Sequence, residues 1–362
     1  MSEPPATPWL VTVGGFLGAG KTTLILAAAR ELERRGFRSA VIMNDQGSAL
    51  VDSSFAGLSG MRFGEVAGGC FCCRLSDLIH VMGELRAHRP DVIFAEPVGS
   101  CTDISATVLH PLLDEGGSLR IAPLTVLVDP ARANELWGED GDSKMRFLLE
   151  KQLQEADILC LTKSDLGVEC RSLGSASVRR VSARSGQGIA AWLDEVLSGE
   201  IAAGSRLLEI DYEEYARAEA SLAWLNLRAD FEPERPISPP MLMGPLFDHL
   251  DAALTAAGIS IVHLKAIVTS DSGFLKAAIC GNGQEPSIEG RLDASPAKRL
   301  QLLLNLRAMG DPPAVRASVE CELNRIGHGL AGFQIDCFSP AAPRPERRVT
   351  RAPAEAPCHA PA

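Results

Sequence analysis

The sequence predicts an α/β domain with a mostly parallel sheet, followed by a smaller α+β domain of ferredoxin-like type. The first domain is indicated by short, continuously apolar runs that alternate with amphipathic stretches of helical period. Continuous apolar strands are typical of a sheet that helices cover on both faces. This rhythm changes near Gly199, which indicates that a second unit follows.

The elements of the first domain, residues 1–198, alternate along the chain. The apolar runs predict strands at residues 9–13, 40–43, 92–95, 124–128 and 158–161. The stretches between them predict helices at residues 22–35, 77–87, 144–155 and 189–197. Strands that alternate with helices imply βαβ units and therefore a mostly parallel sheet.

The second domain, residues 220–338, follows a polar and uneven stretch that predicts a linker at residues 199–219. Its pattern predicts the order βαββαβ, which is typical of a ferredoxin-like fold. The expected elements are a strand at 222–231, a helix at 240–257, strands at 260–269 and 273–280, a helix at 295–309 and a strand at 314–320. Residues 339–362 are rich in Pro, Ala and Arg and predict a disordered tail.

Composition excludes several classes of function. The net charge of -11 argues against non-specific binding to nucleic acid or to anionic lipid. No apolar run approaches the roughly 20 residues that span a bilayer. Residues 1–8 lack the basic and apolar regions of a secretory signal. We therefore expect a cytoplasmic protein with no nucleic-acid partner and no membrane partner.

A glycine-rich turn lies between the first expected strand and the first expected helix. Residues 15–22 read Gly-Phe-Leu-Gly-Ala-Gly-Lys-Thr and match the P-loop pattern G-x-x-x-x-G-K-[ST]. The glycines let backbone N–H groups point at phosphate oxygens, and the helix N-terminus adds a partial positive charge. Lys21 would reach the β- and γ-phosphates, and Thr22 would bind Mg²⁺. The expected nucleotide contacts are Gly15, Gly18, Ala19, Gly20, Lys21, Thr22 and Thr23.

The identity of the base depends on a loop after the strand at 158–161. GTPases usually have Asn-Lys-x-Asp there, with the Asp accepting N–H bonds from guanine and the Lys stem covering the ring. Lys163 and Asp165 are present, while Thr162 replaces the Asn. Ser182 and Ala183 resemble the loop whose backbone contacts guanine O6. These residues favour GTP over ATP, since adenine would leave a buried carboxylate unpaired. The alternative is that the first loop is an ordinary helix cap.

Two other segments are candidates for contact with the γ-phosphate. Glu96 leaves the strand at 92–95 and is placed to hold Mg²⁺ through water or to orient the attacking water; the alternative is an exposed strand end. Gly99 would let the backbone approach the γ-phosphate. Residues 44–47 follow the second strand and form the other candidate switch, with Asp52 just beyond. The candidate catalytic residues are Lys21, Glu96 and Asp45.

Three cysteines lie within four residues, at Cys70, Cys72 and Cys73. Thiols at this spacing can converge on one soft or borderline ion such as Zn²⁺ or Co²⁺. The spacing is short for a structural zinc site and suits an open site, with a fourth ligand from Glu65, a His or water. The alternative is a set of partly buried, reactive thiols without metal. Single cysteines elsewhere, such as Cys101, are expected to be small buried hydrophobes.

Together these segments resemble the CobW-type P-loop GTPases, which are relatives of UreG and HypB. The resemblance rests on the P-loop with its flanking Gly14 and Thr23, on Glu65 with the Gly-Cys-Phe-Cys-Cys segment, and on Glu96-x-x-Gly99. It implies a GTP-dependent metallochaperone in which the Cys-x-Cys-Cys motif binds Zn²⁺ or Co²⁺ and GTP state governs metal loading and release. The sequence departs from the family pattern at Thr162, at Asp45, where Glu is usual, and in lacking a His-rich loop.

The order of the motifs suggests a mechanism. The cysteines lie between the Asp45 region and Glu96, so Mg²⁺-GTP would order both segments and draw the thiolates into metal-binding geometry. A second hypothesis is a nucleotide-driven assembly or reactivation partner of a corrinoid enzyme or another metalloenzyme. A kinase is a third, although no acceptor site is evident. The expected partners are a client metalloprotein and a second copy in a nucleotide- or metal-dependent homodimer.

Overall fold

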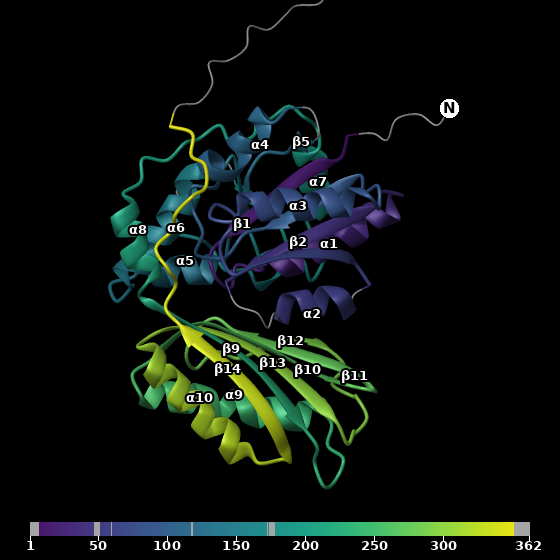
Figure 1. The fold of residues 1–362 in the computed structure, drawn as a ribbon, viewed down its shortest axis with the longest axis vertical. Helices are drawn as coiled ribbons and strands as arrows, with labels where there is room; N and C mark the ends of the chain where they lie inside the picture. The colour runs from purple at the N-terminus through teal and green to yellow at the C-terminus, as the bar shows by residue number, and fades with distance from the viewer. Residues whose placement is uncertain are drawn as a thin grey trace, which may run out of the picture.

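The structure is a computed structural model that describes residues 7–46, 51–58, 60–116, 119–171, 173 and 178–350. Its first domain is a parallel sheet with strand order β3-β2-β4-β1-β6-β7-β8, in which β5 also pairs with β1 (Figure 1). The strands are β1 Trp9–Gly15, β2 Ser39–Asp45, β3 Arg62–Ala67, β4 Val92–Glu96, β5 Arg120–Ile121, β6 Thr125–Val128, β7 Ile158–Leu161 and β8 Val178–Arg180. The predicted α/β class is confirmed.

Helices cover both faces of this sheet. They are α1 Lys21–Arg34, α2 Val51–Leu58, α3 Leu75–Arg86, a π-helical turn Ser105–Leu109 that runs into α4 His110–Asp114, α5 Pro130–Leu136, α6 Ser143–Glu155, α7 Ile189–Val196 and α8 Tyr212–Glu219. Successive strand residues point to opposite faces. Leu10 therefore joins the apolar cluster of α3 and α6, whereas Val11 joins the cluster of α1 and α7.

The second domain is an antiparallel sheet with strand order β12-β11-β10-β13-β9-β14. Its elements are β9 Leu222–Phe231, α9 Pro239–Ala256, β10 Ser260–Ser270, β11 Gly273–Ile279, β12 Ser287–Gly290, β13 Leu300–Met309, α10 Pro312–Ile326 and β14 Leu330–Phe338. The strands β10, β13, β9 and β14 have the ferredoxin-like order, and the β11–β12 hairpin extends one edge. The predicted fold class is thus confirmed, although two elements differ.

The predicted helix at 295–309 and the predicted strand at 314–320 are both wrong. Residues 300–309 form the central strand β13, because Leu302, Leu304 and Leu306 alternate onto the face that packs on the helices. The leucines favoured a helix by propensity, and burial between two strands overrides that preference. Residues 312–326 form α10 instead, where Val315 and Val319 share one helical face.

The predicted linker and tail also differ from the structure. Residues 212–219 of the linker form α8, and its Tyr215 is completely buried in the core of the first domain. Residues 339–350, which we call the C-terminal strap, run back over the first domain (Figure 1). The prediction of disorder is therefore wrong for the strap, and residues 351–362 lie outside the described part of the chain. No helix within the described residues is long and apolar enough to cross a membrane.

The two domains meet face to face. Helices α9 and α10 cover one face of the antiparallel sheet, and its other face is turned toward α2 and the P-loop (Figure 1). On that face, side chains such as Ile267 and Leu303 join the core of the first domain. The face of the second sheet that α9 and α10 leave uncovered, which we call the open face, therefore lies over the P-loop.

Candidate functional site

The P-loop lies where β1 ends and α1 begins. Gly20 caps α1 with φ of +88°, a left-handed conformation that favours glycine. The Lys21 Nζ atom donates to the backbone oxygens of Gly15 at 2.9 Å and Phe16 at 3.4 Å. Burial is the main reason that the pKa of Lys21 is lowered. The cavity beside this loop is lined by Gly18, Gly20, Lys21, Thr22 and Thr23, and Ala19 is buried behind it.

Glu96 lies against the P-loop, as its place at the end of β4 predicted. Its Oε1 atom accepts a hydrogen bond of 2.9 Å from Thr22 Oγ1, and its Oε2 atom is buried without a hydrogen-bond partner among the described residues. Burial, followed by the charge of Asp52, raises the pKa of Glu96 to about 7. A hydroxyl and a buried carboxylate beside Lys21 are oxygen donors that suit Mg²⁺.

Gly99 brings the segment after β4 close to the P-loop. A Cβ atom at Gly99 would lie 2.7 Å from Leu17 Cδ2 and 3.1 Å from Leu17 Cα. The second of these is a backbone atom, so a side chain here would push the two segments apart. Glycine therefore allows this approach without a shift of Leu17.

The loop predicted to bind the base lies beside the same cavity. Lys163, which lines it, has φ of +53° and forms an ion pair of 2.6 Å with Asp129. Asp165 is brought to the second predicted loop, because Ser182 Oγ donates to its Oδ1 at 2.6 Å. Thr162 Oγ1 donates to Val128 O at 3.2 Å, so this residue links β7 to β6. Ala183 follows Ser182 and is partly buried.

Asp45 has a partner that the sequence did not reveal. Both of its carboxylate oxygens accept from Arg307 Nη2, at 2.8 and 3.0 Å. Arg307 comes from β13 of the second domain, and its guanidinium stacks 3.9 Å from the centre of the Trp224 ring. The candidate catalytic Asp45 therefore lies at the cavity wall as half of a buried ion pair between domains. Gly47, the other residue of this predicted switch, lies outside the described residues.

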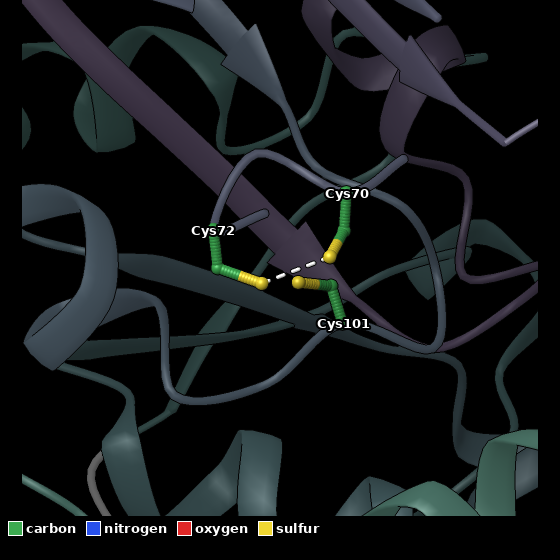
Figure 2. A group of neighbouring side chains, drawn as sticks. All are labelled: Cys70, Cys72 and Cys101. Atoms are coloured by element: carbon green, nitrogen blue, oxygen red, sulfur yellow. Dashed lines mark hydrogen bonds between the residues drawn. The ribbon is translucent and has the colours of Figure 1, made fainter. Parts of the chain in front are cut away.

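The cysteine motif forms a compact group of thiols, with an unexpected member. The Sγ atoms of Cys70, Cys72 and Cys101 all lie within 4.8 Å of one another, and Figure 2 shows them converging from two loops. The Sγ atoms of Cys70 and Cys72 are 2.8 Å apart. Cys73 Sγ is 3.3 Å from that of Cys70 and is half-buried. Glu65 lies on β3 and is not a member of the group formed by these described residues.

The expectation that Cys101 is a lone buried hydrophobe is wrong. Hydrogen bonds from Cys70 and Cys72 lower its pKa to about 6, whereas burial acts in the opposite direction. Hydrogen bonds with Cys101, and then with Cys70 and Cys73, raise the pKa of Cys72. The hydrogen bonds within the group therefore stabilise one thiolate that the neighbouring thiols share. The sequence feature that could have identified Cys101 is its position, because it follows Glu96 by five residues in the same segment.

Hydrogen bonds tie the thiols to both segments that flank the P-loop. Asn44, next to Asp45, donates from Nδ2 to Gly69 O at 2.7 Å and accepts at Oδ1 from Phe71 N at 2.9 Å. The other segment is held by Gln152, whose Nε2 donates to the backbone oxygens of Gly99 and Cys101 at 3.0 Å each. The thiol group is thus joined to the Asp45 segment by the side chain of Asn44 and to the Glu96 segment by the backbone that carries Cys101.

The C-terminal strap covers the cysteine loop. The backbone N–H of Arg344 donates to Cys73 Sγ at 3.1 Å, and that of Glu346 donates to Cys72 O at 2.9 Å. The Glu346 carboxylate accepts from the backbone N–H and hydroxyl of Ser76, at 3.0 and 2.6 Å. The strap, which follows the second domain, therefore contacts the cysteine loop of the first domain.

Several known proteins are similar to part of this chain. The zinc chaperone YeiR of Escherichia coli K12 is 32% identical over 161 residues, which cover 42% of this chain and 45% of that protein. The zinc chaperone CobW of a Sinorhizobium species is 29% identical over 225 residues, 55% of this chain and 60% of that protein. The chain thus spans about half the length of the curated relatives it matches.

A solved structure of HypB from Helicobacter pylori in complex with nickel aligns at 14% identity with a TM-score of 0.41. It covers 55% of this chain and 92% of that one. Residues 9–186 match the family model described as "CobW/HypB/UreG, nucleotide-binding domain". The predicted resemblance to the CobW-type P-loop GTPases is therefore confirmed for this part of the chain.

Proposed function

We propose that the chain is a GTP-dependent metallochaperone that carries Zn²⁺ or Co²⁺ to a client metalloprotein. The observation that carries this proposal is the place of the thiol group between the two segments that flank the P-loop. Asn44 ties the cysteine loop to the end of β2, and Cys101 belongs to the segment that starts at Glu96. A change at the γ-phosphate would reach the thiols through these short connections.

The thiol group supports a soft or borderline ion as the cargo. Three converging sulfurs, from Cys70, Cys72 and Cys101, match the preference of Zn²⁺ for thiolate ligands, and Co²⁺ shares it. Cys73 lies next to them as a further donor. The relatives YeiR and CobW are named zinc chaperones, which favours zinc. Glu65 stays a predicted ligand.

The loop of Lys163, which lines the cavity, and the loop of Ser182, which contacts it, support GTP as the nucleotide. The Asp165 carboxylate would accept the two N–H groups of the guanine edge, and the hydroxyl of Ser182 already orients it. The stem of Lys163 would cover the ring. These residues discriminate against adenine, which would leave the carboxylate without donors.

The contacts at the P-loop support hydrolysis of the β–γ anhydride. Thr22 and Glu96 would hold Mg²⁺, which supplies charge neutralisation at the phosphate oxygens when bound. Lys21 would bind the β- and γ-phosphates. The second carboxylate oxygen of Glu96, buried and without a partner among the described residues, would accept a hydrogen bond from the attacking water and so orient it. For Asp45, the ion pair with Arg307 supports a positioning role.

The partners follow from this activity. A metallochaperone needs a client metalloprotein, and a nucleotide- or metal-dependent homodimer stays a prediction. A cytoplasmic location fits, because free thiols persist where the glutathione and thioredoxin systems keep them reduced.

Metal content tests the proposal directly. We expect the full-length protein, exposed to Zn²⁺ and desalted, to retain one ion per chain. The triple variant Cys70→Ser, Cys72→Ser, Cys101→Ser should retain none, and Cys321→Ser, which changes an exposed cysteine on α10, should retain it all. Phosphate release from GTP without a phosphorylated product would exclude a kinase. Full retention of zinc by the triple variant would contradict the proposal and favour a nucleotide-driven reactivation partner.

A further inference from the structure

The open face of the second sheet carries a polar row that the proposed function does not use. In the register of the strands, Lys265 on β10 faces Asn305 on β13, and Asn305 faces Asn226 on β9. The next row holds His263 beside Arg307. This face is turned toward the P-loop, although a sheet face packed on another domain is normally apolar.

These polar side chains hold the start of α2 and the residue that ends β2. Besides the pair between Arg307 and Asp45, the Asn305 Oδ1 atom accepts from the backbone N–H of Val51 at 3.0 Å. Lys265 forms an ion pair with Asp52 of α2. Farther along the helix, the Lys276 ammonium lies 3.9 Å from the centre of the Phe55 ring. The second domain thus holds both Asp45, in the candidate switch, and helix α2.

Lys265 also faces the phosphate site itself. It lines the same cavity as Lys21, Thr22 and Glu96. Burial is the main cause of the lowered pKa of Lys21, and the charge of Lys265 acts in the same direction. The two ammonium groups are therefore close enough to sense each other. Both would face the terminal phosphate of a nucleotide whose β- and γ-phosphates lie at Lys21.

The pair between Lys265 and Asp52 is buried, with 12% and 19% of the two side chains exposed. Burial acts to raise the pKa of Asp52, but the charges of Lys265 and then Lys276 outweigh it and hold the pKa below its usual value. A buried ammonium needs an anionic partner. A γ-phosphate offers one that carries more charge than a carboxylate, and Asp52 keeps the nearby charge of Lys276.

The other cations of this face, Arg307 and Lys276, are held more firmly than Lys265. The guanidinium of Arg307 donates to Asp45, Leu225 O and Asn226 and stacks on Trp224. Lys276 is held by Glu289 and by the ring of Phe55. Lys265 has a flexible stem and a carboxylate partner on α2, so it can change partner without breaking such a network.

We propose that Lys265 is a γ-phosphate ligand supplied by the second domain, and that it leaves Asp52 when a nucleoside triphosphate binds. The inference rests on the proposed binding of GTP at the P-loop. Release of Asp52 removes one of the contacts that clamp α2 to the second sheet. The second domain would thereby distinguish GTP from GDP and loosen the switch next to the cysteine loop.

The experiment compares the affinity of the full-length protein for Mg²⁺-GDP and for a non-hydrolysable Mg²⁺-GTP analogue. In Lys265→Met we expect the analogue to bind about 10- to 100-fold more weakly, as for the loss of a charged hydrogen bond, and GDP within about twofold of wild type. In Asp52→Asn we expect tighter binding of the analogue, because Lys265 no longer has to leave a carboxylate. Lys298→Met, an exposed lysine of the second domain, is the matched control.

The double variant Asp52→Asn, Lys265→Met leaves no buried charge unpaired and guards against a folding defect. It should bind GDP like wild type and the analogue as weakly as Lys265→Met. If Lys265→Met and Asp52→Asn both weaken GDP and analogue equally, Lys265 serves only to hold α2 and the inference is wrong. A wild-type protein that binds neither nucleotide would instead overturn the proposed GTP binding.

Discussion

Asp45 at the end of β2 and Arg307 on β13 form a buried ion pair that joins the two domains beside the P-loop. The sequence distance between them is 262 residues, so the pair exists only because the second sheet lies over the first domain. We expect Arg307→Met to destabilise the protein by about 3–5 kcal/mol, because it removes the guanidinium that neutralises the buried Asp45 carboxylate in this ion pair. Chemical denaturation followed by circular dichroism measures this loss.

A second variant separates the ion pair from simple packing. Asp45→Asn, Arg307→Met removes both charges and should recover at least about 1 kcal/mol relative to the sum of the two single changes. Strictly additive losses would show that the two residues do not stabilise each other. Arg299→Met, an exposed arginine of the same domain, should change the free energy of unfolding by less than about 0.5 kcal/mol.

The buried position of Cys101 makes it a test of the thiol group. We expect Cys101→Ser to weaken zinc binding as much as Cys70→Ser does, by at least about tenfold, because each removes one of three converging sulfurs. Competition with a zinc-sensitive dye gives the affinities. Cys160→Ser, a buried cysteine on β7 outside the group, is the control. An unchanged zinc affinity in Cys101→Ser would show that Cys101 is a small buried hydrophobe and not a zinc ligand.

The strap should slow the reaction of the Cys73 thiol with thiol reagents. Its sulfur accepts the backbone N–H of Arg344 and is half-buried. Truncation after Phe338 should therefore speed its modification by a thiol reagent about tenfold or more, which corresponds to an opening cost of roughly 1.4 kcal/mol. Truncation after Thr350 leaves the strap intact and is the matched control. Equal rates in the two truncated proteins would show that the strap does not protect the thiol.

Glu155 predicts a particular dependence of stability on pH. Burial raises its pKa from 4.5 to about 8, although Thr102 and Ser105 donate hydrogen bonds to it. The folded state thus holds this proton more tightly than the unfolded state. Its contribution to stability is full below about pH 4.5 and is lost as the pH rises through about 8.

In the wild-type protein, the titration of Glu155 should lower the free energy of unfolding by a few kcal/mol between these pH values, at about 1.4 kcal/mol per pKa unit. We expect Glu155→Gln to lack this decrease. Urea denaturation at a series of pH values provides the curves. Glu139→Gln, which changes an exposed glutamate, should follow the wild-type curve. A curve for Glu155→Gln that is parallel to wild type would show that this carboxyl titrates normally.

Local patterns predicted most of the first domain and its phosphate site. Strand, glycine turn and helix are contiguous around Lys21, so their chemistry can be deduced from spacing alone. Glu96 was predictable because a strand end in a parallel sheet has a known place. The place of Cys101 in the thiol group was not predictable, because it depends on contact with a second loop, which carries Cys70 and Cys72.

The second domain was harder to predict for the same physical reason. β13 is rich in leucine and has helical propensity, and only its neighbours β10 and β9 make it a strand. Its residues Asn305 and Arg307 alternate with the buried leucines and line the cavity beside the P-loop. The contacts between the second domain and the P-loop region are thus far apart in sequence, and no local pattern contains them.

The titration of zinc in two nucleotide states tests the proposed coupling most directly. Zn²⁺ is titrated into the full-length protein with saturating Mg²⁺-GDP and, separately, with a non-hydrolysable Mg²⁺-GTP analogue. Because Asn44 and the segment from Glu96 to Cys101 join the thiols to the phosphate site, we expect at least about fivefold tighter zinc binding with the analogue. Linkage requires zinc to favour the analogue over GDP by the same factor. Equal zinc affinities in the two states would contradict the coupling.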